Sequence, residues 1–305
     1  MKADDYLNKI LDSQTFDNGD PELESLRERI TAVKELLRRA FAGSNPSIRQ
    51  AGSLAKDTMV KESYDGDVTC YFPHEQTDPG ESLAAIYESV QRVLERDYYV
   101  SAKPSALRIK DKGVDSYGTD FHIDVVPGRF VDDEKSDVHL HRNSTEKSYL
   151  KTNLQVHIDH VRKSGIRSAI RLAKLWNIRN GVGAKTFVLE LLVIKLLEEK
   201  KSAPLSEQLF HVWTELRDRP NDLAVEDPAN PTGNDLKPIM AECRWSLSAV
   251  AGDTLAQIEA AGWESVFGPV VEGDGGDGGG GGAKQTAALK SAAAVLPRRT
   301  KPWSR

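Results

Sequence analysis

The sequence contains little cysteine, no long apolar run and no excess of positive charge. Its two cysteines, Cys70 and Cys243, are too few for a disulfide framework and are not spaced as a zinc site. No stretch approaches the roughly 20 consecutive apolar residues of a membrane-spanning helix. Residues 1–16 also lack the long apolar segment of a signal peptide. We therefore expect a cytoplasmic protein with no membrane partner.

The charge balance bears on the choice of partners. The formal net charge is −5, so no global basic field attracts nucleic acid, and we expect no constitutive DNA binding. Hydrophobic residues make up 39% of the 305 residues and charged residues 29%. A chain of this length and composition can bury a substantial core, in one large domain or in two lobes.

Residues 47–72 carry the first chemical signal. A short strand-like run is followed by Gly52 and Ser53, and then by a few residues compatible with a helix. A glycine at a strand-to-helix turn lets the backbone approach a ligand closely. The start of a helix offers unpaired N–H groups at a positive dipole end, which favours phosphate. The Ser53 hydroxyl adds a further donor, so this turn is a candidate phosphate-binding site.

Three aspartates are candidates for metal binding. Asp65 and Asp67 stand two apart at the start of a predicted strand, so their carboxylates share one face. Such a pair repels unless a cation lies between them, and oxygen ligands favour Mg²⁺ or Mn²⁺. Asp124 lies in a second predicted strand, 121–128, which we expect to end at Pro127 and Gly128. An unpaired carboxylate among Ile and Val is costly, and a metal would explain it.

In chain order these motifs resemble the signature of the polymerase-β-type nucleotidyltransferases. The matching residues are Gly52-Ser53, Thr58, Asp65-x-Asp67 and Asp124-Val-Val-Pro127. Their spacing is similar to that of the branch that holds oligoadenylate synthases and the bacterial cGAS-like enzymes, the CD-NTases. Residues 170–176 with 186–192 resemble the paired helices of this family. Residues 227–234 resemble a loop of its bacterial members, and the resemblance extends over residues 48–268.

The resemblance implies an α+β fold with two lobes and a nucleotide cleft between them. One lobe would be a polymerase-β-like nucleotidyltransferase core, a small mixed sheet with helices, and the other a C-terminal helical lobe. The expected divisions are a helical spine at 1–42, the core at 43–137, the helical lobe at 138–270, and a glycine-rich linker with a basic tail at 271–305. Periodicity independently predicts helices in 4–42, broken near 17–21, and in 81–97, and strands at 98–102 and 106–110.

The resemblance also implies roles for individual residues. Asp65, Asp67 and Asp124 would be catalytic and would hold two Mg²⁺ or Mn²⁺ ions. Gly52, Ser53 and Lys174 would bind the nucleotide phosphates, with Arg171 and Thr58 as secondary candidates.

Two helical patterns add to these assignments. Arg167, Arg171 and Lys174 recur on one helix face, a pattern that a solvated basic stripe would also produce. Glu190 lies in a run that is apolar nearly all round, which predicts a buried helix. We interpret Glu190 as a buried, hydrogen-bonded polar group rather than a catalyst. His157 and His160, three apart, have a spacing that can bind metal, but we interpret them as packing or solvated residues.

The activity implied by the resemblance is synthesis of a cyclic di- or oligonucleotide second messenger from ATP or other NTPs, in bacterial antiphage defence of the CBASS type. Regulatory or effector proteins of the same operon would be its partners. The alternatives are a linear oligonucleotide synthase, a toxin–antitoxin-type nucleotidyltransferase that modifies protein or tRNA, and a nucleotide-binding scaffold without activity. The basic tail is a candidate contact for nucleic acid or protein, or a tail without a fixed partner.

Overall fold

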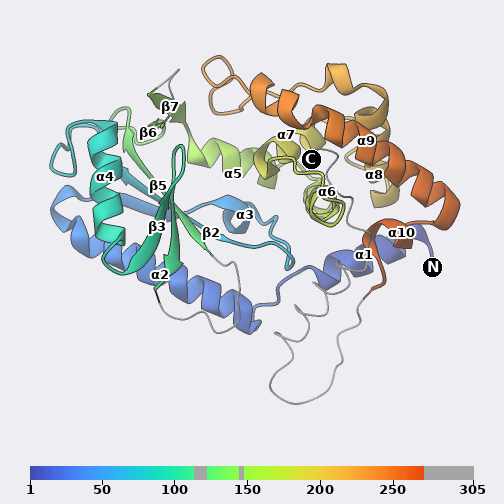
Figure 1. Ribbon diagram of the computed structural model, residues 1–305, viewed down its shortest axis with the longest axis horizontal. Coiled ribbons are helices and arrows are strands. Elements are labelled where there is room, and N and C mark those ends of the chain that lie inside the picture. The colour runs from blue at the N-terminus through green and yellow to red at the C-terminus, as the bar shows by residue number, and fades with distance from the viewer. Residues whose placement is uncertain (113–121, 144–147, 271–305) are drawn as a thin grey trace, which may run out of the picture.

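The computed structural model describes residues 1–112, 122–143 and 148–270. They form two lobes side by side, one built on a mixed β-sheet and one built of helices (Figure 1). The architecture agrees with the expected α+β fold class. The linker and tail predicted for 271–305 lie outside the described residues.

The sheet lobe is organised around two adjacent parallel strands. The sheet has seven strands in the order β1-β2-β5-β4-β3, with β6 paired to β5 and β7 paired to β6. Among the strands in the described residues, β2 and β5 run parallel and the other pairs are antiparallel. The strands are β1 (Ser47–Gln50), β2 (Gly66–Phe72), β3 (Tyr98–Ala102), β4 (Leu107–Asp111), β5 (Ile123–Phe130), β6 (Val138–His141) and β7 (Tyr149–Thr152).

Strand β5 corrects one expectation. It does not end at Pro127 and Gly128 but continues to Phe130. On the side away from β2, β5 pairs with β4 as far as Val125 and with β6 from Gly128 onward. Pro127 lies at the change of partner, where its missing N–H removes no bond from either ladder.

Each lobe has its own hydrophobic core. Helices α2 (Pro21–Ala40) and α4 (Leu83–Leu94) pack on the sheet face that carries Val68, Cys70 and Phe72. The helical lobe contains α5 (Leu154–Arg162), α6 (Arg167–Arg179), α7 (Thr186–Leu196), α8 (Leu205–Asp218), α9 (Lys237–Ala261) and α10 (Glu264–Phe267), with a short 3₁₀ turn at Pro220–Asp222. A second 3₁₀ turn, Ala42–Ser44, lies between α2 and β1 in the sheet lobe. No helix in the described part of the chain is both long and apolar enough to cross a bilayer.

The N-terminal helices divide between the two cores. The predicted break is present, because α1 (Ala3–Ser13) ends well before Pro21 opens α2. The buried side chains of α1 pack in the core of the helical lobe, whereas those of α2 pack against the sheet. The N-terminal segment therefore connects the two lobes. A boundary also differs from expectation: β6 and β7 extend the sheet to Thr152, so the helical lobe begins at α5 rather than at residue 138.

A buried ion pair joins the lobes at one point. Glu62, in the loop after the short helix α3 (Gly52–Lys56), pairs with Arg179 of α6, and both side chains are at most 4% exposed. Glu62 also exchanges two hydrogen bonds with Gln14, which lies between α1 and α2. Arg179 donates in addition to the carbonyl of Phe267. This contact fixes the loop after α3 against the helical lobe.

Candidate active site

The register of β2 and β5 brings two of the predicted carboxylates together. Asp67 and Asp124 are direct partners across this parallel pair. Because side chains alternate along a strand, both carboxylates lie on the sheet face opposite the α2–α4 core. Asp67 is only partly buried, whereas every other residue of β2 is buried. Asp65 immediately precedes the strand, so all three predicted aspartates gather at one end of the sheet.

The Gly-Ser turn packs directly against this carboxylate pair. Gly52 opens α3 with φ of 64°, a left-handed conformation that favours glycine. A Cβ at this position would lie 1.6 Å from Oδ2 of Asp67. The adjacent Ala51 N–H donates to the Asp67 carbonyl at 2.9 Å. The glycine is therefore required for both its backbone conformation and its contact with the aspartate.

Burial and mutual repulsion both disfavour the charged form of Asp67. Burial, first, and the charges of Asp65 and Asp124, second, together raise the pKa of Asp67 to about 7. Lys56 and His122 oppose the shift. A carboxylate in this state gains from any cation that approaches the cluster.

Two partners of the aspartates were not anticipated from the sequence. Arg108 of β4 makes a bidentate ion pair with Asp124, with two N–O distances of 2.8 Å. His122 Nε2 lies 3.3 Å from Asp65 Oδ2. Arg108 stands directly opposite Asp124 in the β4–β5 register, which only the strand pairing reveals. Asp124 thus has a counter-ion from the protein, and its presence among Ile and Val does not by itself require a metal.

A second cluster surrounds Glu190 on α7. The Glu190 side chain is 2% exposed and contacts Lys56 Nζ at 2.7 Å and Lys174 Nζ at 3.7 Å. The Thr58 hydroxyl donates to Oε1 of Glu190 at 3.1 Å. This matches the interpretation of Glu190 as a buried polar group with its partners in place. The cluster ties α3, which carries the Gly-Ser turn, to α6 and α7 of the helical lobe.

Lys174 occupies the centre of this junction. Its ammonium donates to the carbonyl of Thr58 at 2.8 Å. Burial lowers its pKa, and Glu190 opposes that effect most strongly, followed by Asp65 and Asp67. Lys174 is thus close enough to the acidic cluster to interact with it.

The two secondary candidates are placed differently. Thr58 is fully buried, and its hydroxyl donates a hydrogen bond to Glu190. The Arg171 guanidinium donates to the Thr15 hydroxyl at 2.5 Å and to the Met59 carbonyl at 3.2 Å. Arg171 thus holds the backbone at Met59 and Thr58 hydrogen-bonds to Glu190, and these contacts direct neither side chain to the aspartates.

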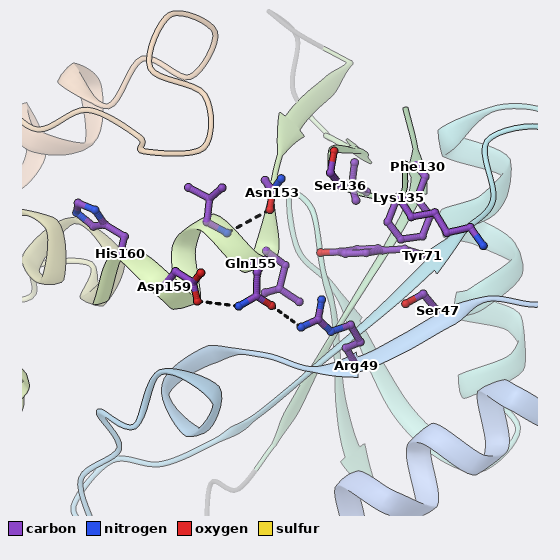
Figure 2. Close-up of a pocket in the computed structure, with 13 residues that line it drawn as sticks. Ser47, Arg49, Tyr71, Phe130, Lys135, Ser136, Asn153, Gln155, Asp159 and His160 are labelled. Carbon is purple, nitrogen blue, oxygen red and sulfur yellow. Dashed lines mark hydrogen bonds between the residues drawn. The ribbon is translucent and has the colours of Figure 1, made fainter. Parts of the chain in front are cut away.

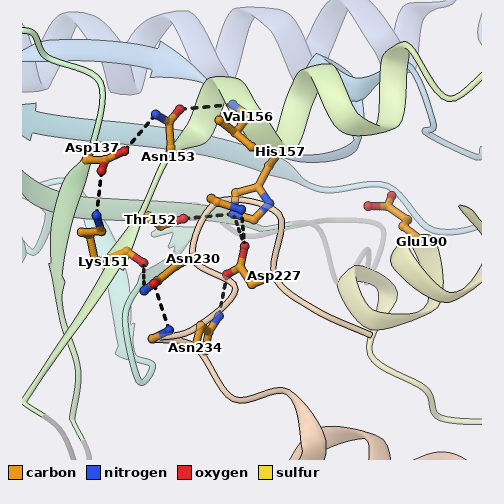
Figure 3. A network of polar contacts seen from close by, with 12 residues as sticks. Asp137, Lys151, Thr152, Asn153, Val156, His157, Glu190, Asp227, Asn230 and Asn234 are labelled. Atoms are coloured by element: carbon orange, nitrogen blue, oxygen red, sulfur yellow. Dashed lines mark hydrogen bonds and ion pairs between the residues drawn. The ribbon is translucent and has the colours of Figure 1, made fainter. Parts of the chain in front are cut away.

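The predicted 227–234 loop is held by a polar network (Figure 3). Asp227 is 1% exposed, accepts from Asn234 at 2.6 Å, and lies 3.3 Å from His157 Nε2 on α5. The Thr152 hydroxyl lies 3.0 Å from the same nitrogen. Asn230 donates to the Lys151 carbonyl on β7 at 3.0 Å. His157 is therefore a packing residue that fastens the loop to the end of the sheet, and its pKa is lowered by burial.

The donors present suit a hard divalent cation. Among the described residues, no group of three or more His, Cys, Asp or Glu side chains is already arranged as a metal cage. The carboxylates of Asp65, Asp67 and Asp124 nevertheless supply oxygen ligands on one face. Burial and the neighbouring negative charges raise the pKa of Asp67, and a nearby cation would offset both effects. The residues therefore fit Mg²⁺ or Mn²⁺.

The chain matches no family model and no curated protein. Its fold is similar to that of several solved structures. CdnC of Escherichia coli MS115-1 with ATP has 19% identity and a TM-score of 0.65, over 89% of this chain and 99% of that one. The cyclic AMP-GMP synthase DncV of Vibrio cholerae, with the linear intermediate pppA(3′,5′)pG, has 17% identity and a TM-score of 0.65, over 88% and 97%.

A third structure extends the likeness further along the chain. The CD-NTase CdnG of Bradyrhizobium diazoefficiens in complex with GTP has 13% identity and a TM-score of 0.66, over 96% of this chain and 99% of that one. At these identities the likeness establishes the fold. The chain shares the fold of these structures over nearly their whole length.

Proposed function

We propose that this chain is a metal-dependent nucleotidyltransferase that joins NTPs into a cyclic di- or oligonucleotide. The observation that supports this most directly is the alignment of Asp67 with Asp124 across β2 and β5, with Gly52 packed against Asp67. Acidic residues beside a glycine turn suit a triphosphate and its cation. The fold is that of structures solved with ATP, GTP and a linear dinucleotide intermediate.

The chain's residues would divide the chemistry between them. Gly52 and Ser53 bind the β- and γ-phosphates through backbone N–H groups and the Ser53 hydroxyl, and Lys174 adds positive charge at the triphosphate. The acceptor hydroxyl oxygen of a second nucleotide bonds to the α-phosphorus as the bond to pyrophosphate breaks, and the hydroxyl proton passes to water. Orientation of the two nucleotides supplies most of the rate enhancement.

Asp65, Asp67 and Asp124 would hold two Mg²⁺ or Mn²⁺ ions, which when bound neutralise triphosphate charge and lower the pKa of the acceptor hydroxyl. Arg108 on β4 holds the Asp124 carboxylate in place through two hydrogen bonds. The arrangement needs no side-chain nucleophile.

The biological setting we propose is antiphage defence of the CBASS type in the bacterial cytoplasm. One of the similar structures is a complex of CdnC with a HORMA protein lacking its N-terminus. By analogy we propose regulatory or effector proteins of the same operon as partners. A toxin–antitoxin-type enzyme that modifies protein or tRNA is the second candidate, since it would use the same carboxylates; the helical lobe and the 227–234 loop favour the synthase.

The test is incubation of the purified protein with four labelled NTPs and Mg²⁺ or Mn²⁺, followed by phosphatase and mass spectrometry. The control is the double variant Asp65→Ala/Asp67→Ala. A phosphatase-resistant small product that the variant does not make is the expected result. A phosphatase-sensitive oligonucleotide would instead identify a linear synthase, and label on added tRNA or protein would identify the modifying enzyme. No turnover with any of the four NTPs, either metal and a lysate of phage-infected cells would overturn the proposal.

A further inference from the structure

A pocket of about 690 Å³ lies on the sheet face away from the α2–α4 core (Figure 2). Strands β1 and β2, the end of β5, the turn before β6 and helix α5 enclose it. Its volume is within the range of about 300–1,000 Å³ that is usual for small-molecule sites.

This pocket is separate from the candidate active site. Tyr71, which forms part of its wall, lies four residues after Asp67 on β2, a distance of about 13 Å along a strand. None of the candidate metal-binding or phosphate-binding residues lines it. A ligand here would not occupy the place proposed for the reacting phosphates.

The floor of the pocket is aromatic. Tyr71 and Phe130 meet edge to face with ring centroids 5.8 Å apart, and Val138 packs with them in a small apolar cluster. The Tyr71 side chain is only 4% exposed, yet its hydroxyl has no hydrogen-bond partner among the described residues and reaches into the pocket (Figure 2). An aromatic floor with an unused hydroxyl suits a planar ring that carries polar atoms at its edge.

The rim carries positive charge that acidic residues do not neutralise. Arg49 donates to the neutral side-chain amide of Gln155 at 2.7 Å. Within the described parts of the chain, no carboxylate lies at ion-pair distance from Arg49 or Lys135. The one carboxylate of the lining, Asp159, is engaged by Gln155 at 2.8 Å and Lys163 at 2.9 Å. Two cations without acidic partners at the mouth of a pocket favour an anionic group there.

The backbone also holds Lys135 in an unusual position. Its φ is 54°, a left-handed conformation that costs a non-glycine residue of order 1 kcal/mol. The turn around it is closed by a hydrogen bond of 2.9 Å from the Val131 N–H to the Asp137 carbonyl. Lys135 is therefore held at the pocket by the surrounding turn.

We propose that this pocket binds a planar heteroaromatic anion of about the size of a nucleoside monophosphate, with its ring over Tyr71 and Phe130 and its anionic group between Arg49 and Lys135. Because α5 forms one wall and leads from the sheet into the helical lobe, an occupant contacts both lobes.

The test measures binding rather than turnover, so its outcome is independent of the proposed function. The full-length protein is titrated calorimetrically in EDTA with AMP, GMP, CMP and UMP, and with the four matching nucleosides. At least one monophosphate is expected to bind about tenfold more tightly than its nucleoside. In the variant Arg49→Gln/Lys135→Gln its affinity falls about tenfold, and in Asp65→Ala/Asp67→Ala it is unchanged.

Two controls separate a loss of binding from a loss of folding. Arg49 and Lys135 are both exposed, so the variant Arg49→Gln/Lys135→Gln is expected to have the unfolding temperature of the wild type. A second variant, Ser136→Trp, places a large side chain in the lining and should also remove binding. The proposal is refuted if no monophosphate binds better than its nucleoside, or if binding survives both pocket variants, whether or not the aspartate variant still binds.

Discussion

Glu190→Gln is expected to destabilise the protein strongly, although it changes one oxygen to nitrogen. The substitution keeps the volume of the side chain and removes its charge. Lys56 and Lys174 then lose their shared counter-ion, while both remain largely buried, with side chains 13% and 7% exposed. Within the described residues, Lys174 then has the Thr58 carbonyl as its remaining acceptor.

The magnitude follows from the desolvation of the lysines. Removal of one partner from a buried ion pair costs about 3–5 kcal/mol, because a charge remains in a low-dielectric site without compensation. At about 2–4 °C per kcal/mol for large domains, the unfolding temperature should fall by about 6 °C or more. Urea denaturation followed by circular dichroism measures the free energy of unfolding, and thermal unfolding measures the unfolding temperature.

Glu199→Gln is the matched control, since Glu199 lies just after the same helix and is exposed. It should change the unfolding free energy by no more than about 0.5 kcal/mol. A loss below about 1 kcal/mol in Glu190→Gln would show that Glu190 does not neutralise the two lysines. In that case the junction between α3 and the helical lobe would have to be held by the Glu62–Arg179 pair and apolar packing alone.

Three further substitutions test other parts of the site. Gly52→Ala should cost about 1–3 kcal/mol in chemical denaturation, because its Cβ collides with Asp67 at a positive φ, whereas Gly43→Ala, with open space around it, should cost less than about 1 kcal/mol. Arg108→Met should lower the unfolding temperature by an amount that added Mg²⁺ partly restores, since a cation near Asp124 replaces the guanidinium; a loss indifferent to Mg²⁺ would count against the metal assignment. Because burial lowers the pKa of His157, beside Asp227, Lys56, His160 and Glu190, the folded state favours its neutral form; wild-type stability should therefore fall relative to His157→Gln as pH drops from 7 to 5, and parallel pH profiles would disprove this.

The local elements could be predicted because they depend on side-chain periodicity. Residues 98–102 form β3 as expected, and the apolar run after Asp65-x-Asp67 forms β2. The break near 17–21 between the N-terminal helices is also present, since Pro21 suits a first helical position and no interior one. The buried setting of Glu190 followed from an apolar helix pattern.

The partners of the charged residues could not be predicted in the same way. Arg108 meets Asp124 only because β4 pairs with β5 in one particular register. Likewise, Lys56 and Glu190 are 134 positions apart in the sequence and contact each other where α3 meets the helical lobe. The continuation of β5 through Pro127 depended on a change of neighbouring strand that no local pattern records.

By itself the sequence determined which residue types alternate along each strand and helix, and therefore which side chains share a face. Only the tertiary structure decided which faces meet. It paired Asp67 with Asp124, gave Asp124 an arginine, enclosed Glu190 between two lysines, and formed the pocket over Tyr71 and Phe130. The reason is physical: the face of an element follows from short-range periodicity, whereas strand register and lobe packing depend on burial and charge summed over residues far apart in the chain.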